Sequence, residues 1–209
     1  MPLYKEIILK DNAKLYLWKI TEDIDELHHA VKLNNSSQNR VDSMKSESHQ
    51  KGFLSVRMLL QHVGYNDFDL YYDSFGKPHL TDGKHISISH SHTFSAIAIS
   101  NQPIGLDVEQ VKEKILKIAS RFMDVSHLEN LSEIEKMKKA TVIWGIKESI
   151  FKIKNIEGIS FRNHIFEKDF LFENKRAEAK LMFNNNEEKF NILFDSIEDY
   201  IFVCAFEKQ

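Results

Sequence analysis

Hydrophobic and polar positions alternate at the start of the chain. Residues 4–9 and 14–20 follow the two-residue period of strands, because successive side chains of a strand point to opposite faces. The pair Asp11-Asn12 lies between the two segments and favours a turn. The pattern therefore predicts an antiparallel hairpin at the N-terminus.

The next segments follow a helical period. Residues 21–33 are expected to form a helix with Thr21 as its N-cap, and the polar residues 34–39 are expected to form a loop. Apolar residues then recur at helical spacing over residues 40–62, and Gly64 is a suitable stop.

The rest of the chain divides into segments with strand or helix periods. Two helical segments are expected, at 112–123 and at roughly 127–154. The predicted strands are 68–72, 85–89, 94–100, 104–110, 164–172, 177–183, 189–194 and 200–206.

These segments fall into two halves on either side of the polar residues 101–103. We expect an N-terminal half, 1–102, and a C-terminal half, 103–209, each a mainly antiparallel sheet packed against a long helix. The predicted fold class is α+β with two similar halves that form a pseudo-dimer.

Composition limits the partners that this chain can have. Its 28 basic and 31 acidic side chains give a net charge of −3, which offers no global attraction to nucleic acid or to an anionic membrane. A single cysteine, Cys204, excludes an intramolecular disulfide and a cysteine-built zinc site. The first residues contain no apolar stretch typical of a signal peptide, and no segment is long and apolar enough to span a membrane, so a cytoplasmic protein is expected.

Two acidic residues share one face of the strand predicted at 104–110. Asp107 and Glu109 are two positions apart, so their carboxylates project together and repel each other unless a cation or a proton lies between them. Hard oxygen ligands of this kind suit magnesium. A solvated strand edge with two surface acids is the alternative for such a pair on its own.

A second group of polar residues lies on the predicted helix that contains an apolar stripe. Glu148 and Lys152 are four residues apart and share a face, one turn after Trp144. They are either a surface ion pair or a further metal ligand and a phosphate contact. The stripe itself consists of Ile143, Ile146, Ile150 and Ile153.

The third group follows a turn. Gly76 and Pro78 shape a turn that presents Lys77, and Ser89 and His90 end a predicted strand where an anion could be bound. His90 and His92 have the spacing of a zinc pair, but no other ligand spacing supports zinc.

Taken in order, these motifs resemble those of the 4′-phosphopantetheinyl transferases. The resemblance is closest to the longer, pseudo-dimeric type, and its motifs cover about residues 75–152. They are Gly76-Lys77-Pro78, Ser87 to Ser91, Gly105-x-Asp107-x-Glu109 and Trp144-x-x-Lys147-Glu148-x-x-x-Lys152.

The resemblance implies a role for each matching residue. Asp107, Glu109 and Glu148 would hold Mg²⁺, Glu148 would also accept a proton from the attacking serine, and Lys152 would contact the phosphate that is transferred. A coenzyme A site is implied at Asp107 and Lys152 and at further positions in the N-terminal half: Lys51 (with Arg40 as the alternate), Gly76, Lys77, Pro78, Ser89 and His90.

The implied reaction transfers the phosphopantetheine arm of coenzyme A to a serine of an apo acyl or peptidyl carrier protein and releases 3′,5′-ADP. The enzyme is expected to be a monomer. Two departures from the family pattern are Ser149 in place of alanine and His127 in place of a glutamate, for which Glu129 is the expected substitute.

The carrier protein is expected to be acidic around its serine, and a basic surface would attract it. The candidates are Lys112, Lys114, Lys117 and Arg121, although solvated helix charges explain these residues equally well. Two other functions stay open: a magnesium-dependent phosphohydrolase of a small diphosphate, and a non-enzymatic module that binds coenzyme A or a nucleotide.

Overall fold

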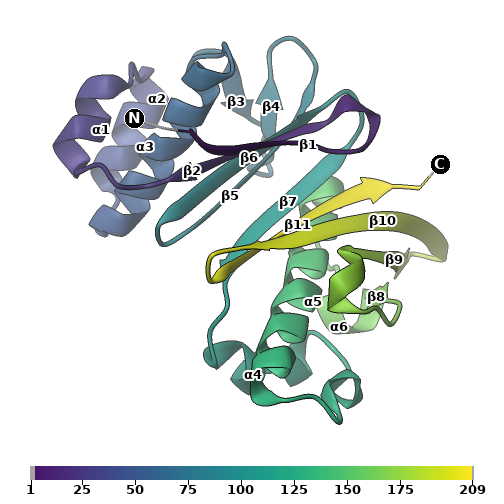
Figure 1. Ribbon diagram of the computed structural model, residues 1–209. Helices are drawn as coiled ribbons and strands as arrows, with labels where there is room; N and C mark the ends of the chain where they lie inside the picture. The colour runs from purple at the N-terminus through teal and green to yellow at the C-terminus, as the bar shows by residue number, and fades with distance from the viewer. Residues whose placement is uncertain (1–2, 209) are drawn as a thin grey trace. The chain divides into compact units, whose positions relative to one another are not determined.

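The computed structural model describes residues 3–208, which form two compact units, Met1–Gln102 and Pro103–Gln209. The N-terminal unit contains a four-stranded antiparallel sheet with the order β1-β2-β6-β5 and a two-stranded ribbon, β3-β4. Its helices gather beside the sheet (Figure 1). The elements are β1 (Leu3–Ile8), β2 (Lys14–Lys19), α1 (Ile24–Ala30), α2 (Asn35–Ser43), α3 (Glu47–His62), β3 (Leu70–Tyr72), β4 (Pro78–Leu80), β5 (His85–Ser91) and β6 (Phe94–Ser100).

Helix α3 supplies most of the core of this unit. It packs against β6, β2 and β5, and α1 packs against it in turn. Leu54, Leu59 and Leu60 are completely buried on α3, and Ile97 of β6 is buried in the same cluster. Gly64 has a positive φ of 90° just after the last turn, as expected for a glycine that ends a helix.

Three sequence predictions for this unit were wrong in detail. The N-cap of α1 is Asp23, which forms a capping box with Glu26, so the helix begins later than the prediction with Thr21. The polar segment 34–39 belongs largely to α2, because the Asn34 side chain accepts a hydrogen bond from the Ser37 amide and caps this helix. The single helix predicted from residue 40 is interrupted before α3 begins.

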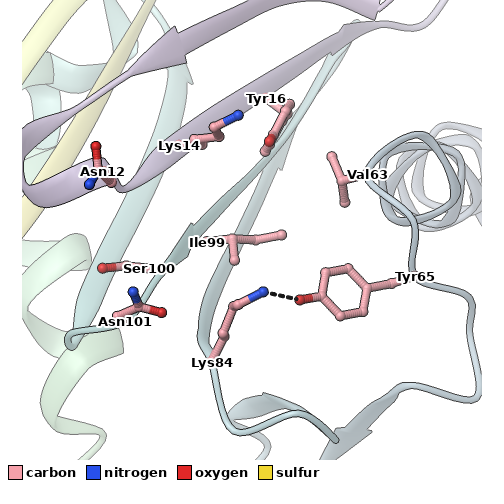
Figure 2. Close-up of a pocket in the computed structure, with 9 residues that line it drawn as sticks. All are labelled: Asn12, Lys14, Tyr16, Val63, Tyr65, Lys84, Ile99, Ser100 and Asn101. Atoms are coloured by element: carbon pink, nitrogen blue, oxygen red, sulfur yellow. Dashed lines mark hydrogen bonds between the residues drawn. The ribbon is translucent and has the colours of Figure 1, made fainter.

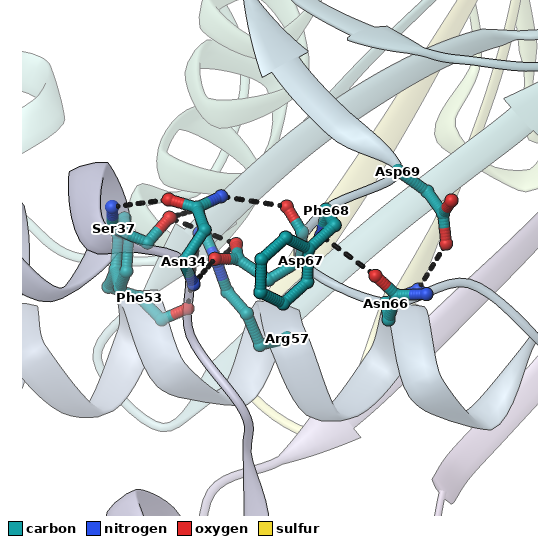
Figure 3. A network of polar contacts seen from close by, with 8 residues as sticks. All are labelled: Asn34, Ser37, Phe53, Arg57, Asn66, Asp67, Phe68 and Asp69. Carbon is teal, nitrogen blue, oxygen red and sulfur yellow. Dashed lines mark hydrogen bonds and ion pairs between the residues drawn. The ribbon is translucent and has the colours of Figure 1, made fainter.

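A buried ion pair joins α3 to the segment before β3. Arg57 and Asp67 have 3% and 1% of their side chains exposed, and Arg57 Nε lies 2.9 Å from Asp67 Oδ1. Asp67 also accepts hydrogen bonds from the Asn34 amide at 2.8 Å and from Ser37 Oγ at 2.9 Å (Figure 3). The Arg57 guanidinium lies 3.5 Å from the centre of the Phe53 ring. The network therefore ties the start of α2, the middle of α3 and the loop before β3 together.

Removing one partner of this pair should strongly destabilise the protein. Arg57→Met leaves the Asp67 carboxylate buried without its cation, which costs about 3–5 kcal/mol of unfolding free energy. Urea denaturation measures this loss. The matched control is Lys136→Met in the exposed pair with Glu133, which should cost at most about 1 kcal/mol. Equal losses in the two variants would contradict the importance given to the buried network.

The C-terminal unit contains a five-stranded antiparallel sheet with the order β7-β11-β10-β9-β8. Its long helix α5 packs against β7 and β11, and α4 packs against α5 (Figure 1). The helices are α4 (Lys114–Ile118), α5 (Glu133–Lys154) and α6 (Phe161–His164). The strands are β7 (Ile104–Gln110), β8 (Ile165–Glu167), β9 (Arg176–Phe183), β10 (Asn186–Ile197) and β11 (Tyr200–Glu207).

The boundaries of the helices differ from the prediction because of local capping. Helix α5 begins after Ser132, whose side chain forms a capping box with Glu135, so the predicted start near residue 127 is too early. The segment before it forms a single 3-10 turn, Val125–Leu128. The helix predicted at 112–123 is limited to α4 and another 3-10 turn, Ala119–Arg121.

The predicted α+β class is confirmed, since each unit has an antiparallel sheet packed against one long helix, α3 or α5. Cys204 of β11 is fully buried. Among residues 3–208, no helix has the length and apolar character needed to cross a membrane.

Candidate active site

The acidic strand β7 faces the long helix α5. A Cβ added at Gly145 of α5 would lie 3.7 Å from Asp107 Oδ2, so the Asp107 carboxylate points toward this helix. Asp107 is 4% exposed and Glu109 is half-buried. Residues two apart share a strand face, and Glu109 therefore lies on the face that carries Asp107.

Two glycines allow α5 to approach the sheet very closely. A Cβ at Gly105 would lie only 1.9 Å from the Ser149 carbonyl oxygen, and a Cβ at Gly145 would lie 2.5 Å from Val203 Cγ2. Neither position has room for a larger residue. Ser149 Oγ donates a hydrogen bond to the Val203 carbonyl at 3.0 Å, which fixes the helix against β11. This contact sets the distance between the acids of β7 and the polar residues of α5.

Lys152 bridges from α5 to β7. Its Nζ donates hydrogen bonds to the Leu106 carbonyl at 2.8 Å and to Asp107 Oδ1 at 2.9 Å. The Lys152 side chain is 28% exposed, whereas the Asp107 side chain is almost completely buried. A cation therefore contacts the buried carboxylate from the side of the helix.

Glu148 has a strongly perturbed carboxyl group. The pKa of Glu148 is raised to about 7, chiefly by burial and also by the negative charges of Asp107 and Glu109, while the Lys152 ammonium opposes these effects. A carboxyl group with a pKa near neutrality exchanges protons readily at physiological pH, which is the property required of a general base. The predicted residues Asp107, Glu109, Glu148 and Lys152 are thus brought together in one unit.

These carboxylates fit magnesium in their chemistry, because all three are hard oxygen ligands and each of Asp107 and Glu109 acts electrostatically on Glu148. They do not form a completed shell. Within the part of the chain that the structure describes, no three His, Cys, Asp or Glu side chains are arranged to hold a metal ion. Side-chain rotation would be needed to gather the three acids around an ion.

A third polar group on α5 was missed by the sequence analysis. Lys147 is 2% exposed and donates hydrogen bonds to the Ile165 carbonyl and to Glu167 Oε2, both at 2.5 Å. Burial lowers the pKa of Lys147, and Glu167 opposes this shift. His127 Nδ1 lies 3.2 Å from the other carboxylate oxygen of Glu167. The sequence does indicate that Lys147 is buried, since this residue is four positions after Ile143 and lies on the apolar stripe.

Apart from Asp107 and Lys152, the residues predicted to contact coenzyme A lie in the N-terminal unit. Gly76 has a positive φ of 79°, and Asp73 holds its turn through hydrogen bonds from the amides of Phe75 at 2.9 Å and Lys77 at 3.0 Å. Lys77 is half-buried there, and Pro78 begins β4.

The remaining candidates of this unit lie around α3. Ser89 is buried and His90 is exposed on β5, and a Cβ at Gly52 would lie 2.8 Å from His90 Nδ1. The imidazole therefore packs against the α3 backbone next to Lys51, whose Nζ pairs with Glu47 at 3.1 Å. The alternate candidate, Arg40, lies elsewhere, over the rings of Tyr72 and Phe53 at 5.1 and 5.6 Å.

Comparison with known proteins identifies a family that matches the segment carrying these acids. Residues 103–205 match the model of the 4′-phosphopantetheinyl transferase superfamily. This segment, just under half of the chain, belongs to the superfamily.

Individual members of the superfamily match different lengths of the chain. 4′-Phosphopantetheinyl transferase gsp of Aneurinibacillus migulanus is 34% identical over 83 residues, which are 38% of this chain and 35% of that protein. For 4′-phosphopantetheinyl transferase Sfp of Bacillus subtilis (strain 168), the identity is 35% over 37% of each chain. For 4′-phosphopantetheinyl transferase ffp of Bacillus subtilis, it is 28% over 63% of each chain. The matches to gsp and Sfp thus span little more than a third of those proteins.

The close packing of α5 against β7 can be tested directly by substitution of a glycine. Gly105→Ala places a methyl group against the Ser149 carbonyl, so α5 must move away from β7, and we expect a loss of about 3 kcal/mol or more in unfolding free energy. The control is Gly83→Ala, which meets no neighbouring atom and pays only for its positive φ, about 1–2 kcal/mol. Chemical denaturation compares the two variants. A Gly105→Ala protein as stable as Gly83→Ala would show that the close approach is not required.

Proposed function

We propose that this chain transfers the 4′-phosphopantetheine arm of coenzyme A to a serine of an apo acyl or peptidyl carrier protein and releases 3′,5′-ADP. The observation that supports this most strongly is Glu148, a half-buried carboxyl group with a pKa of about 7. It lies beside the Asp107–Lys152 pair in the segment that matches the superfamily.

The serine oxygen attacks the β-phosphorus of coenzyme A. A new oxygen–phosphorus bond forms as the bond to the oxygen of the leaving 3′,5′-ADP breaks, and Glu148 accepts the serine proton. Lys152 contacts the phosphate during transfer, and its partly exposed side chain and positive charge suit this role.

Magnesium is the proposed cofactor, and Asp107, Glu109 and Glu148 would hold it. When bound, it would neutralise negative charge on the two phosphates. The mutual repulsion of the three acids supports this assignment, since a cation relieves it. Lys152 already supplies one positive charge to Asp107, so this residue would share its carboxylate with the ion or turn toward the substrate phosphate.

The N-terminal unit would hold the other phosphates of coenzyme A. We assign this role to Lys77 with its turn residues Gly76 and Pro78, to Ser89 and His90, and to Lys51. The contact of His90 with the α3 backbone at Gly52 supports the grouping of His90 with Lys51. Arg40 is the alternate basic residue, stacked on Tyr72.

The acidic carrier protein would dock on a basic surface of α4 and the turn after it. Lys114, Lys117 and Arg121 are exposed there, and Lys112 is half-buried. Lys117 has only a distant acidic partner, Glu113, at 3.9 Å. We propose a monomeric enzyme acting in the cytoplasm.

Formation of 3′,5′-ADP separates this function from the two others that the sequence left open. The full chain is incubated with coenzyme A and magnesium, with and without an apo carrier protein, and the nucleotide product is followed by chromatography. The transferase releases 3′,5′-ADP only when apo carrier is present. A phosphohydrolase would cleave coenzyme A without the carrier, and a binding module would release no product, so either result would contradict the proposal.

The phosphate contacts of the N-terminal unit are tested by substrate binding. Lys77→Gln and His90→Ala should each weaken coenzyme A binding by about tenfold or more, because each removes a charge-assisted contact. Dephospho-coenzyme A lacks the 3′-phosphate and should bind more weakly to the unmodified protein. Calorimetric titration measures these affinities. Unchanged binding in both variants would show that the two residues do not contact the phosphates.

A further inference from the structure

The N-terminal unit contains a pocket of about 300 Å³ that the proposed reaction does not use. It lies at the end of α3 beside β2 and β6, and none of the residues assigned above to coenzyme A or magnesium lines it (Figure 2). The lining is polar, with an apolar portion. Its residues are Asn12, Lys14, Tyr16, Val63, Tyr65, Lys84, Ile99, Ser100 and Asn101.

Two lysines and two tyrosines provide hydrogen-bond donors in this pocket. Lys84 Nζ donates to Tyr65 Oη at 3.2 Å, and Tyr65 Oη donates to Asp82 Oδ2 at 2.6 Å (Figure 2 shows the Lys84–Tyr65 contact). Lys14 lies two positions from Tyr16 on the same face of β2. Each side of the pocket therefore presents an ammonium group together with a phenol.

The lysines on the two sides of the pocket, Lys14 and Lys84, both act electrostatically on Tyr16. Tyr16 is only 8% exposed, and burial and the negative charge of Glu6 raise its pKa, whereas the positive charges of both Lys14 and Lys84 lower it. Both ammonium groups are thus within electrostatic reach of the same buried phenol. An anion in this pocket would experience the two positive charges together.

The acidic partners of these lysines lie outside the lining. Lys14 Nζ pairs with Glu6 at 2.9 Å and Lys84 Nζ pairs with Asp82 at 3.2 Å, and all four side chains are more than a third exposed. Exposed ion pairs of this kind are weak, because water screens both charges. A ligand anion can therefore compete for the two ammonium groups.

We propose that this pocket binds a small organic phosphate. Its phosphoryl oxygens would accept hydrogen bonds from Lys14, Lys84 and the Tyr16 hydroxyl, and its apolar body would lie on Val63 and Ile99. A phosphate suits the arrangement better than a carboxylate, because it offers three strong acceptor oxygens to donors that approach from two sides.

The proposal is tested by NMR titration of the full chain with phenyl phosphate, while inorganic phosphate and benzoate serve as comparison probes. We expect saturable shifts at Tyr16 and Tyr65, with phenyl phosphate binding more tightly than either comparison probe. Inorganic phosphate lacks the apolar body and benzoate lacks the third acceptor oxygen. Equal affinities for the three probes, or the absence of shifts at both tyrosines, would overturn the proposal.

Substitutions then identify the donors. Lys14→Gln and Lys84→Gln should each weaken phenyl phosphate binding by about tenfold or more. Lys10→Gln, at an exposed lysine of the same hairpin, should leave it unchanged. Lys77→Gln should also leave unchanged the NMR shifts that phenyl phosphate causes at Tyr16 and Tyr65. This result separates the pocket from the proposed coenzyme A site. The proposal fails if the pocket variants bind phenyl phosphate as well as Lys10→Gln does.

Discussion

Asp107→Asn is expected to lower transfer of the phosphopantetheine arm by about 10³-fold or more while the fold is retained. Asparagine has the shape of aspartate but lacks the charge that would hold magnesium and that pairs with Lys152. A bound metal ion contributes several kcal/mol of transition-state stabilisation, and each 1.36 kcal/mol corresponds to about a tenfold change in rate. Lys152 keeps its hydrogen bond to the Leu106 carbonyl in this variant.

The control for this experiment is Asp169→Asn, which removes an exposed carboxylate of the same unit. This control should transfer at the rate of the unmodified protein, and circular dichroism should show that both variants are folded. Wild-type transfer by Asp107→Asn, or transfer that is undiminished in excess chelator, would contradict the metal assignment.

Glu148→Gln is expected to reduce turnover by about 10²–10⁴-fold and to leave coenzyme A binding partly intact. Glutamine keeps one oxygen that can contact a metal ion, but it cannot accept the serine proton. Single-turnover transfer and calorimetric binding measure the two quantities separately. Lys152→Gln should differ, raising the Michaelis constant for coenzyme A as well as lowering turnover, since it removes a phosphate contact.

The same Glu148→Gln substitution should stabilise the protein at high pH in the absence of metal. The folded-state pKa of Glu148 is raised to about 7 from its ordinary value of 4.5, so ionising this half-buried carboxyl group opposes folding. The carboxyl group therefore has no effect on stability below pH 4.5, and its destabilising effect grows between pH 4.5 and 7. Above pH 7 the full cost is about 3 kcal/mol. Glutamine removes this cost.

Thermal denaturation with chelator at pH 5 and pH 8 checks the sign. Glu148→Gln should be more stable than the unmodified protein at pH 8, and the difference should be much smaller at pH 5. The matched control on the same helix is Glu133→Gln, where the side chain is 72% exposed. Near-normal transfer by Glu148→Gln, or an absence of stabilisation at pH 8, would show that Glu148 is an ordinary surface acid.

The parts of the site that could be predicted from the sequence are those with a clear period. Residues 104–110 alternate, so Asp107 and Glu109 could be placed on one strand face, and the structure shows Asp107 directed toward α5. The isoleucine stripe likewise predicted a buried helix face, and Ile143, Ile146 and Ile150 are completely buried. Strand and helix periods contain this information because they decide which side chains point to the core.

Other features depend on contacts between distant residues, which a period does not show. The buried Lys147 is stabilised by Glu167, 20 residues later in the chain, and the Asn34 cap of α2 is held by Asp67, 33 residues away. The polarity of residues 34–39 favoured a loop, yet the side chain of Asn34 satisfies the first free amides of a helix. The role of Gly105 depends on the backbone of α5, which approaches it only in the folded protein.

The mass of an apo carrier protein, measured before and after incubation with this chain, coenzyme A and magnesium, tests the proposed transfer most directly. The carrier should gain the mass of one phosphopantetheine arm at a single serine. This gain in mass should be lost in excess chelator and with Asp107→Asn. A set of apo acyl and peptidyl carriers that all keep their original mass, while a known transferase modifies them under the same conditions, would contradict it.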